Sequence, residues 1–139
     1  MNRDTFKLIH SELIQQVQCI EFNLRRIYAA MCEGKFEDNY RTLENCSLGK
    51  ITKELKKLDC SDDLPELSEE DYKVINDIRV IRNYWCHQCY LDFVYINNER
   101  EREREFQKIA KRLQQDEQRT YDLSVKTEKL YFYFLDRFR

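Results

Sequence analysis

Three side chains in the middle of the chain have the types and spacing that phosphodiester chemistry requires. They are Arg82, Asn83 and His87, in the order R-N-x-x-x-H. An arginine guanidinium is always charged and can bind two phosphate oxygens at once. An imidazole titrates near neutral pH, so it can take a proton from a ribose 2′-hydroxyl and later return one to the leaving oxygen. These residues are therefore the candidates for a catalytic site.

Their spacing sets a geometric condition if the segment is helical. Asn83 and His87 lie four positions apart and share a helix face, where the amide can orient the imidazole. Arg82 and His87 lie five positions apart, about 140° around a regular helix, so they converge only through the reach of the arginine or a local irregularity. The alternative is a partly buried histidine that hydrogen-bonds to the backbone and has an arginine nearby by chance.

Aromatic residues surround this motif. Tyr84, Trp85 and Tyr90 are of the type that stacks on unpaired RNA bases. The alternative for these rings, and for Trp85 above all, is packing in a hydrophobic core.

Cys86 and Cys89 also make a C-x-x-C with His87 inside it. A structural zinc site needs four ligands, commonly from a second such pair, and none exists in this sequence. A redox role is disfavoured because that motif normally follows a strand in an α/β fold. We therefore expect no metal and no cofactor. The six cysteines are expected to be reduced and partly buried.

The elements that position these residues are predicted to be helices. The 139 residues include only two glycines and one proline, which excludes glycine-rich phosphate loops and most β architectures. Apolar residues spaced by three and four predict a long helix from about Thr5 to Met31, capped by Asp4 or Thr5 and stopped at Gly34.

Further helical segments are expected after this first helix. Two shorter segments, 36–43 and 48–58, are separated by a break near Ser47, and 59–70 is an acidic loop. Ser68 and Asp71 resemble a capping box that opens the helix carrying the motif, which could continue to Tyr95. Residues 99–139 form one helix or two.

Together these segments predict one all-α domain spanning 1–139, an up-down bundle of four to five helices. Aromatic residues of the final segment, 130–138, fall on more than one helix face. This distribution favours self-association as a homodimer, the alternative being a terminal helix packed in its own core. The net charge of −2 argues against a generally basic nucleic-acid-binding surface. Without an apolar span or a signal-peptide pattern, we expect a cytoplasmic protein that does not enter membranes.

The segment IRNYWCH, 81–87, resembles the R-x4-6-H motif of HEPN domains in its common RNxxxH form. HEPN domains are all-α bundles of similar length that carry the motif late in the third long helix. The segment SLGKITKELKKL, 47–58, is similar to a helix start found upstream of the motif in some HEPN groups. The resemblance covers most of the chain as architecture and about six residues as a specific motif.

This resemblance implies a metal-independent endoribonuclease that acts as a homodimer, with the two motifs facing each other across a cleft. Arg82 would hold the scissile phosphate, His87 would be the general base and Asn83 would fix their geometry. The product would be a 2′,3′-cyclic phosphate and a free 5′-hydroxyl. Two copies of Arg82, together with Arg79, would make the cleft positive, and Tyr84 and Tyr90 would contact RNA.

Many HEPN proteins are toxins or antiviral effectors, often beside a nucleotidyltransferase-like antitoxin. One subgroup has a tyrosine two residues after the histidine, which that partner adenylylates. This chain has Cys89 there. Tyr90 is the nearest candidate for such a modification. The rival interpretation is a non-catalytic helical module that binds RNA or protein.

Overall fold

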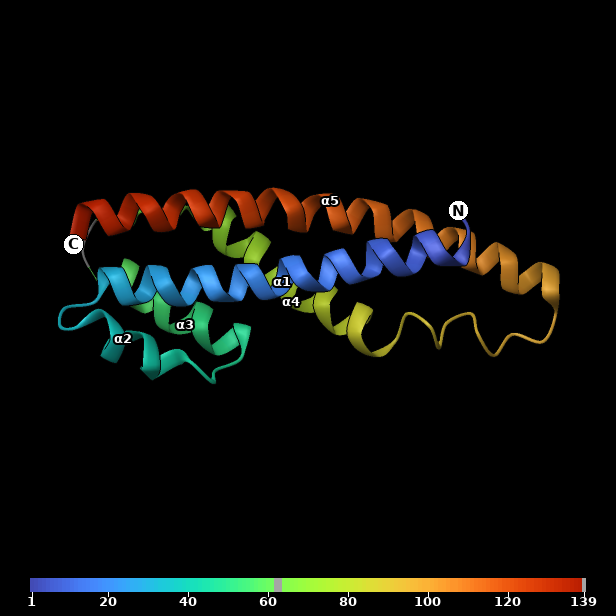
Figure 1. Ribbon diagram of the computed structural model, residues 1–139, viewed down its shortest axis with the longest axis horizontal. Coiled ribbons are helices and arrows are strands. Elements are labelled where there is room, and N and C mark those ends of the chain that lie inside the picture. Colours follow the sequence, from blue (N-terminus) through green and yellow to red (C-terminus); the bar gives the residue numbers. More distant parts are fainter. Residues whose placement is uncertain (62–63, 139) are drawn as a thin grey trace.

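The computed structural model describes residues 1–61 and 64–138 and contains five helices in this part of the chain, with no strand. Figure 1 shows them as an elongated bundle. The predicted all-α fold is confirmed. The helices are α1 (Arg3–Met31), α2 (Phe36–Leu43), α3 (Leu48–Asp59), α4 (Glu69–His87) and α5 (Glu99–Phe138).

Helix α1 follows the predicted apolar stripe but begins earlier than its expected caps. Asn2 is the N-cap, and its side-chain oxygen accepts a hydrogen bond from the Thr5 amide at 2.8 Å. The prediction of Asp4 or Thr5 as the cap was wrong, because Asn2, two residues before Asp4, supplies the side-chain oxygen that accepts from the first turn. Gly34, just beyond the helix, has a φ of +102°, a backbone conformation that favours glycine.

Helices α3 and α4 begin at the predicted signals. Ser47 caps α3 by accepting from the Lys50 amide. Ser68 and Asp71 form a capping box in which each side chain accepts a hydrogen bond from the backbone of the other. The acidic loop predicted between these two helices includes residues 62–63, which lie outside the described residues.

Helix α4 ends at His87 and does not continue to Tyr95. Its last turn is closed by the amides of Gln88 and Cys89, which both donate to the Tyr84 carbonyl. The following turns direct Phe93 into the core, where its ring lies 5.3 Å from that of Phe106. Burial of these aromatic groups outweighs continuation of the helix.

Residues 99–138 form one helix, and residue 139 lies outside the described part. Helices α1 and α5 lie side by side and run in the same direction (Figure 1). Their register is set by contacts such as Gln16 with Glu117 and Asn23 with Thr127. Helix α4 runs in the direction opposite to α1 and α5 (Figure 1). Because direction alternates along an up-down bundle, the first and the fifth helix run parallel.

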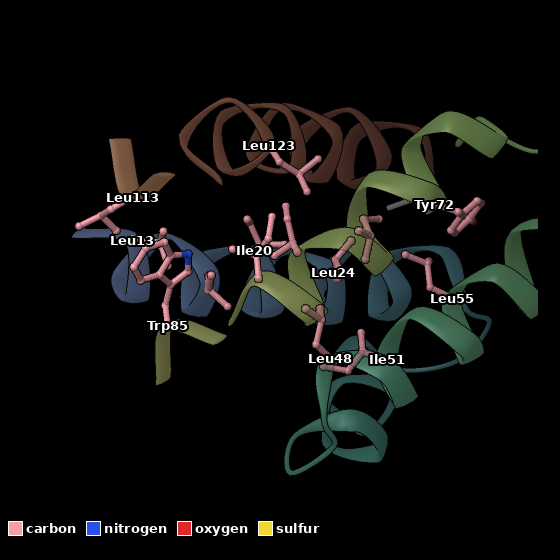
Figure 2. Packing of buried hydrophobic residues seen from close by; sticks show 14 of the residues in the cluster. Leu13, Ile20, Leu24, Leu48, Ile51, Leu55, Tyr72, Trp85, Leu113 and Leu123 are labelled. Atoms are coloured by element: carbon pink, nitrogen blue, oxygen red, sulfur yellow. The ribbon is translucent and has the colours of Figure 1, made fainter. Parts of the chain in front are cut away.

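The core lies where α1, α3, α4 and α5 meet (Figure 2). In the part of the core that Figure 2 draws, Trp85 lies near Leu13 and Leu113 on one side, while Leu55 and Tyr72 lie on the other. The motif is thus carried by a helix with one face fixed in the core.

The six cysteines are free thiols. Cys89 is buried, Cys32 and Cys46 are partly buried, and Cys19, Cys60 and Cys86 are exposed.

Near the end of α5, some of the dense aromatic residues enter this core and others face outward. Phe134 is buried, whereas Phe132, Tyr133 and Phe138 are exposed. This agrees with aromatic groups on more than one face, and the homodimer remains a prediction. No helix among the described residues is long and apolar enough to cross a membrane.

Candidate functional site

The R-N-x-x-x-H motif occupies the last two turns of α4. The helix is unbroken as far as His87, so Arg82 and His87 point about 140° apart around its axis. Arg82 is turned toward α1, while Asn83 and His87 are exposed to solvent. The structure therefore places the two candidate catalytic side chains on one helix end but on different faces of it.

Arg82 forms an ion pair with Glu21 of α1, and the distance from Nη1 to Oε1 is 2.5 Å. Only 26% of the Arg82 side chain and 15% of the Glu21 side chain are exposed. Arg25 lies 3.9 Å from the other Glu21 oxygen and donates to the carbonyls of Leu43 and Cys46. Glu21 thus neutralises Arg82 and ties the motif helix to α1.

His87 and Asn83 are not joined to each other. Within residues 1–61 and 64–138, neither side chain makes a hydrogen bond or an ion pair. The ring of His87 is therefore open to solvent and to any substrate that binds there, and the orienting role expected of Asn83 stays a prediction.

Arg79, one turn before Arg82, packs over the start of α3. A Cβ on residue 49 would lie 2.8 Å from Nη1 of Arg79, so the guanidinium occupies space that the absent side chain of Gly49 leaves open. This contact gives a packing reason for the small residue in the helix start of 47–58.

The three aromatic residues of the motif region have different surroundings. Trp85 is a core residue, 1% exposed, whose Nε1 donates to Asp116 at 2.9 Å. Tyr84 donates from its hydroxyl to Asp92 at 2.9 Å, and burial followed by this hydrogen bond raises the pKa of Tyr84 far above its usual value. Tyr90 is 37% exposed, and burial of part of the side chain raises its pKa as well. Trp85 is therefore not available for stacking on a base.

Two residues near the motif were not identified from the sequence. His10 donates from Nε2 to the Trp85 carbonyl at 2.7 Å, which satisfies one of the last carbonyls of α4. Its position on the stripe between Phe6 and Leu13 was a usable signal. Arg112 of α5 lies over the Tyr84 ring, with its Cζ 4.0 Å from the ring centroid. Only the tertiary arrangement reveals that contact.

The C-x-x-C cysteines point to different environments. Cys89 is buried, its Sγ lies 3.5 Å from the Trp85 carbonyl oxygen, and burial raises the pKa of this thiol to about 11. Cys86 is exposed. No group of three or more potential metal ligands occurs among the described residues. A protonated, core-facing Cys89 is a poor zinc ligand, since zinc binds the thiolate.

The chain was compared with known proteins in three ways. No family model, no curated protein and no solved structure matches it.

Proposed function

We propose that the protein is a metal-independent endoribonuclease of the HEPN type. The observation that carries this proposal is the RNxxxH motif at the solvent-facing end of α4, where His87 is exposed and its side chain is not engaged by the described part of the chain. An imidazole that is free of internal hydrogen bonds can exchange protons with a bound substrate.

The proposed reaction uses side chains of this chain alone. His87 takes the proton of a ribose 2′-hydroxyl, and the 2′-oxygen attacks the adjacent phosphorus. The bond from phosphorus to the 5′-oxygen breaks, and the imidazolium of His87 returns its proton to that oxygen, which yields a 2′,3′-cyclic phosphate and a 5′-hydroxyl. Arg82 stabilises the charge on the phosphate oxygens, for which it must turn part of its guanidinium away from Glu21.

A homodimer is part of this proposal, because Arg82 and His87 of one copy face different directions. Pairing two copies would bring two motifs together and add two copies of Arg79 and Arg82 to one cleft. Exposed apolar residues that follow the motif, Leu91, Val94 and Tyr95, supply apolar area for such pairing. We further propose that the protein is a cytoplasmic toxin or antiviral effector, controlled by a nucleotidyltransferase-like antitoxin for which Tyr90 is the candidate target.

The second candidate function is a non-catalytic helical module that binds RNA or protein. The ion pair between Arg82 and Glu21 favours it, because a neutralised arginine binds phosphate less strongly. The two candidates differ in one measurable property, which is cleavage of RNA.

The test is incubation of single-stranded and structured RNA with the purified protein in EDTA. We expect cleavage with 2′,3′-cyclic phosphate ends, no cleavage where the scissile 2′-hydroxyl is replaced by hydrogen, and a rate about 100- to 10,000-fold lower for His87→Ala. Cys86→Ala is the matched control, because Cys86 is the exposed neighbour of His87. Wild-type protein that cuts no RNA, or that cuts as fast as His87→Ala, refutes the nuclease. A monomeric mass in light scattering refutes the homodimer.

A further inference from the structure

Arg112 and Tyr84 form a layered contact beside the motif. The Arg112 guanidinium lies over one face of the Tyr84 ring, at 4.0 Å from its centroid. The ring is held in turn by Trp85, whose own ring lies 4.8 Å away in an edge-on arrangement, and by the hydrogen bond from the tyrosine hydroxyl to Asp92. The Tyr84 face that Arg112 covers is therefore not available to a ligand, although Tyr84 was one of the residues expected to contact RNA.

The outer side of Arg112 is accessible. Half of its side chain is exposed, and its Nε lies 3.7 Å from an oxygen of Asp116, which fixes one edge of the guanidinium. With its Cζ 4.0 Å from the Tyr84 ring centroid and half of the side chain exposed, Arg112 can offer the other face of its planar guanidinium to a ligand. Such faces stack on nucleobases as aromatic rings do.

The charge around this contact favours a base over a phosphate. Asp116 and Asp92 lie within hydrogen-bond or ion-pair distance of the two stacked side chains and offset the charge of Arg112. A phosphate would be repelled by these carboxylates, whereas the uncharged face of a base would not. The contact thus differs from the phosphate-binding role assigned to Arg82.

The contact also lies close to the candidate general base. Tyr84 precedes His87 by three positions on α4, so the two side chains are neighbours on the helix surface, with a rise of about 4.5 Å between their Cα atoms. A nucleotide whose sugar meets His87 would have its own base or an adjacent base within reach of Arg112.

We infer that Arg112, supported by Tyr84, is a stacking surface for an unpaired RNA base next to the scissile phosphate. The inference rests on the proposed ribonuclease function for its link to cleavage, and it adds a base-contacting residue on α5 to a motif that lies entirely on α4.

The test is binding of a fluorescent single-stranded 2′-fluoro RNA, which lacks the attacking hydroxyl, measured by anisotropy. Arg112→Ala and Arg112→Lys are both expected to weaken binding roughly 5- to 150-fold, the range for one stacked base, because lysine keeps the charge but not the planar group. Arg119→Ala is the matched control. Arg119 lies on the same helix, its side chain is exposed to a similar extent and it also forms an ion pair, with Asp77, so we expect wild-type binding from its variant.

A second probe of the same length, built from abasic residues, separates base stacking from phosphate contact. We expect the Arg112 variants to bind this probe as the wild type does. Equal losses on both probes, or full binding by Arg112→Lys, overturn the stacking surface in favour of a simple charge contact. Thermal unfolding that matches the wild type shows that the Arg112 variants are folded.

The outcome is distinguishable from failure of the proposed function. If the wild type cleaves RNA and the Arg112 variants bind like the wild type, the inference alone is wrong. If the wild type cleaves no RNA, and substitution of Arg112 nevertheless weakens the base-dependent binding, the catalytic proposal is wrong and the stacking surface stands.

Discussion

The hydrogen bond between Trp85 and Asp116 connects the core to the surface beside the motif, and its removal gives a test of the structure. Asp116 is 7% exposed and accepts from Trp85 Nε1 at 2.9 Å. Its other contact is the longer one to Arg112, at 3.7 Å, with half of that arginine side chain in solvent. Asp116→Ala would leave the indole N–H buried without an acceptor.

The expected cost follows from these two contacts. A hydrogen bond to a charged partner contributes roughly 1.5–3 kcal/mol to the free energy of unfolding. A buried donor left without a partner costs a similar amount, and because both figures describe the same interaction they are not added. The half-exposed ion pair with Arg112 adds about 0–1 kcal/mol. We therefore expect Asp116→Ala to lower the free energy of unfolding by about 2–4 kcal/mol. Asp116→Asn, which keeps an acceptor oxygen, should lower it less.

Urea unfolding followed by tryptophan fluorescence measures this directly, because Trp85 is the single tryptophan of the chain. With a slope near 2 kcal/mol per molar urea, the midpoint should fall by about 1–2 M. Asp122→Ala is the matched control, since Asp122 is an exposed aspartate on the same helix that, among the residues the structure describes, hydrogen-bonds with Gln118 alone. A shift for Asp116→Ala no larger than that of the control would refute the buried hydrogen bond.

Two further predictions concern charged pairs between helices. Glu21→Gln removes the charge that neutralises Arg82, so we expect RNA binding to strengthen a few-fold while the free energy of unfolding falls by about 1–2 kcal/mol; weaker RNA binding in the anisotropy assay would contradict competition between Glu21 and phosphate. Burial raises the pKa of Asp71, but hydrogen bonds from Lys126 and Ser68 outweigh it and hold that pKa below its ordinary value. The stability that Asp71 contributes is therefore present above the unfolded-state pKa of about 3.9 and is lost as the pH falls through the folded value. Urea midpoints should thus separate wild type from Asp71→Asn at pH 7 more than at pH 2, and an equal separation at both would show that the carboxylate charge contributes nothing.

The limits of the helices could be predicted only where a local signal marks them. Ser68 and Asp71 open α4 as expected, because both partners of a capping box lie within one turn. The end of α4 at His87 was missed, since it depends on Phe93 reaching a core that α1 and α5 build. Whether 99–138 forms one helix likewise depends on packing along its length against α1.

The helical class, the positions of the apolar stripes and the R-N-x-x-x-H motif follow from the sequence alone, because periodicity and caps act over a few residues. What the motif faces depends on how the helices pack. Glu21 stands 61 positions before Arg82, and Arg112 stands 28 positions after Tyr84, yet both pairs are in contact. Such contacts depend on the register between helices, which is fixed by the packing of whole helix faces and is not encoded in any short segment.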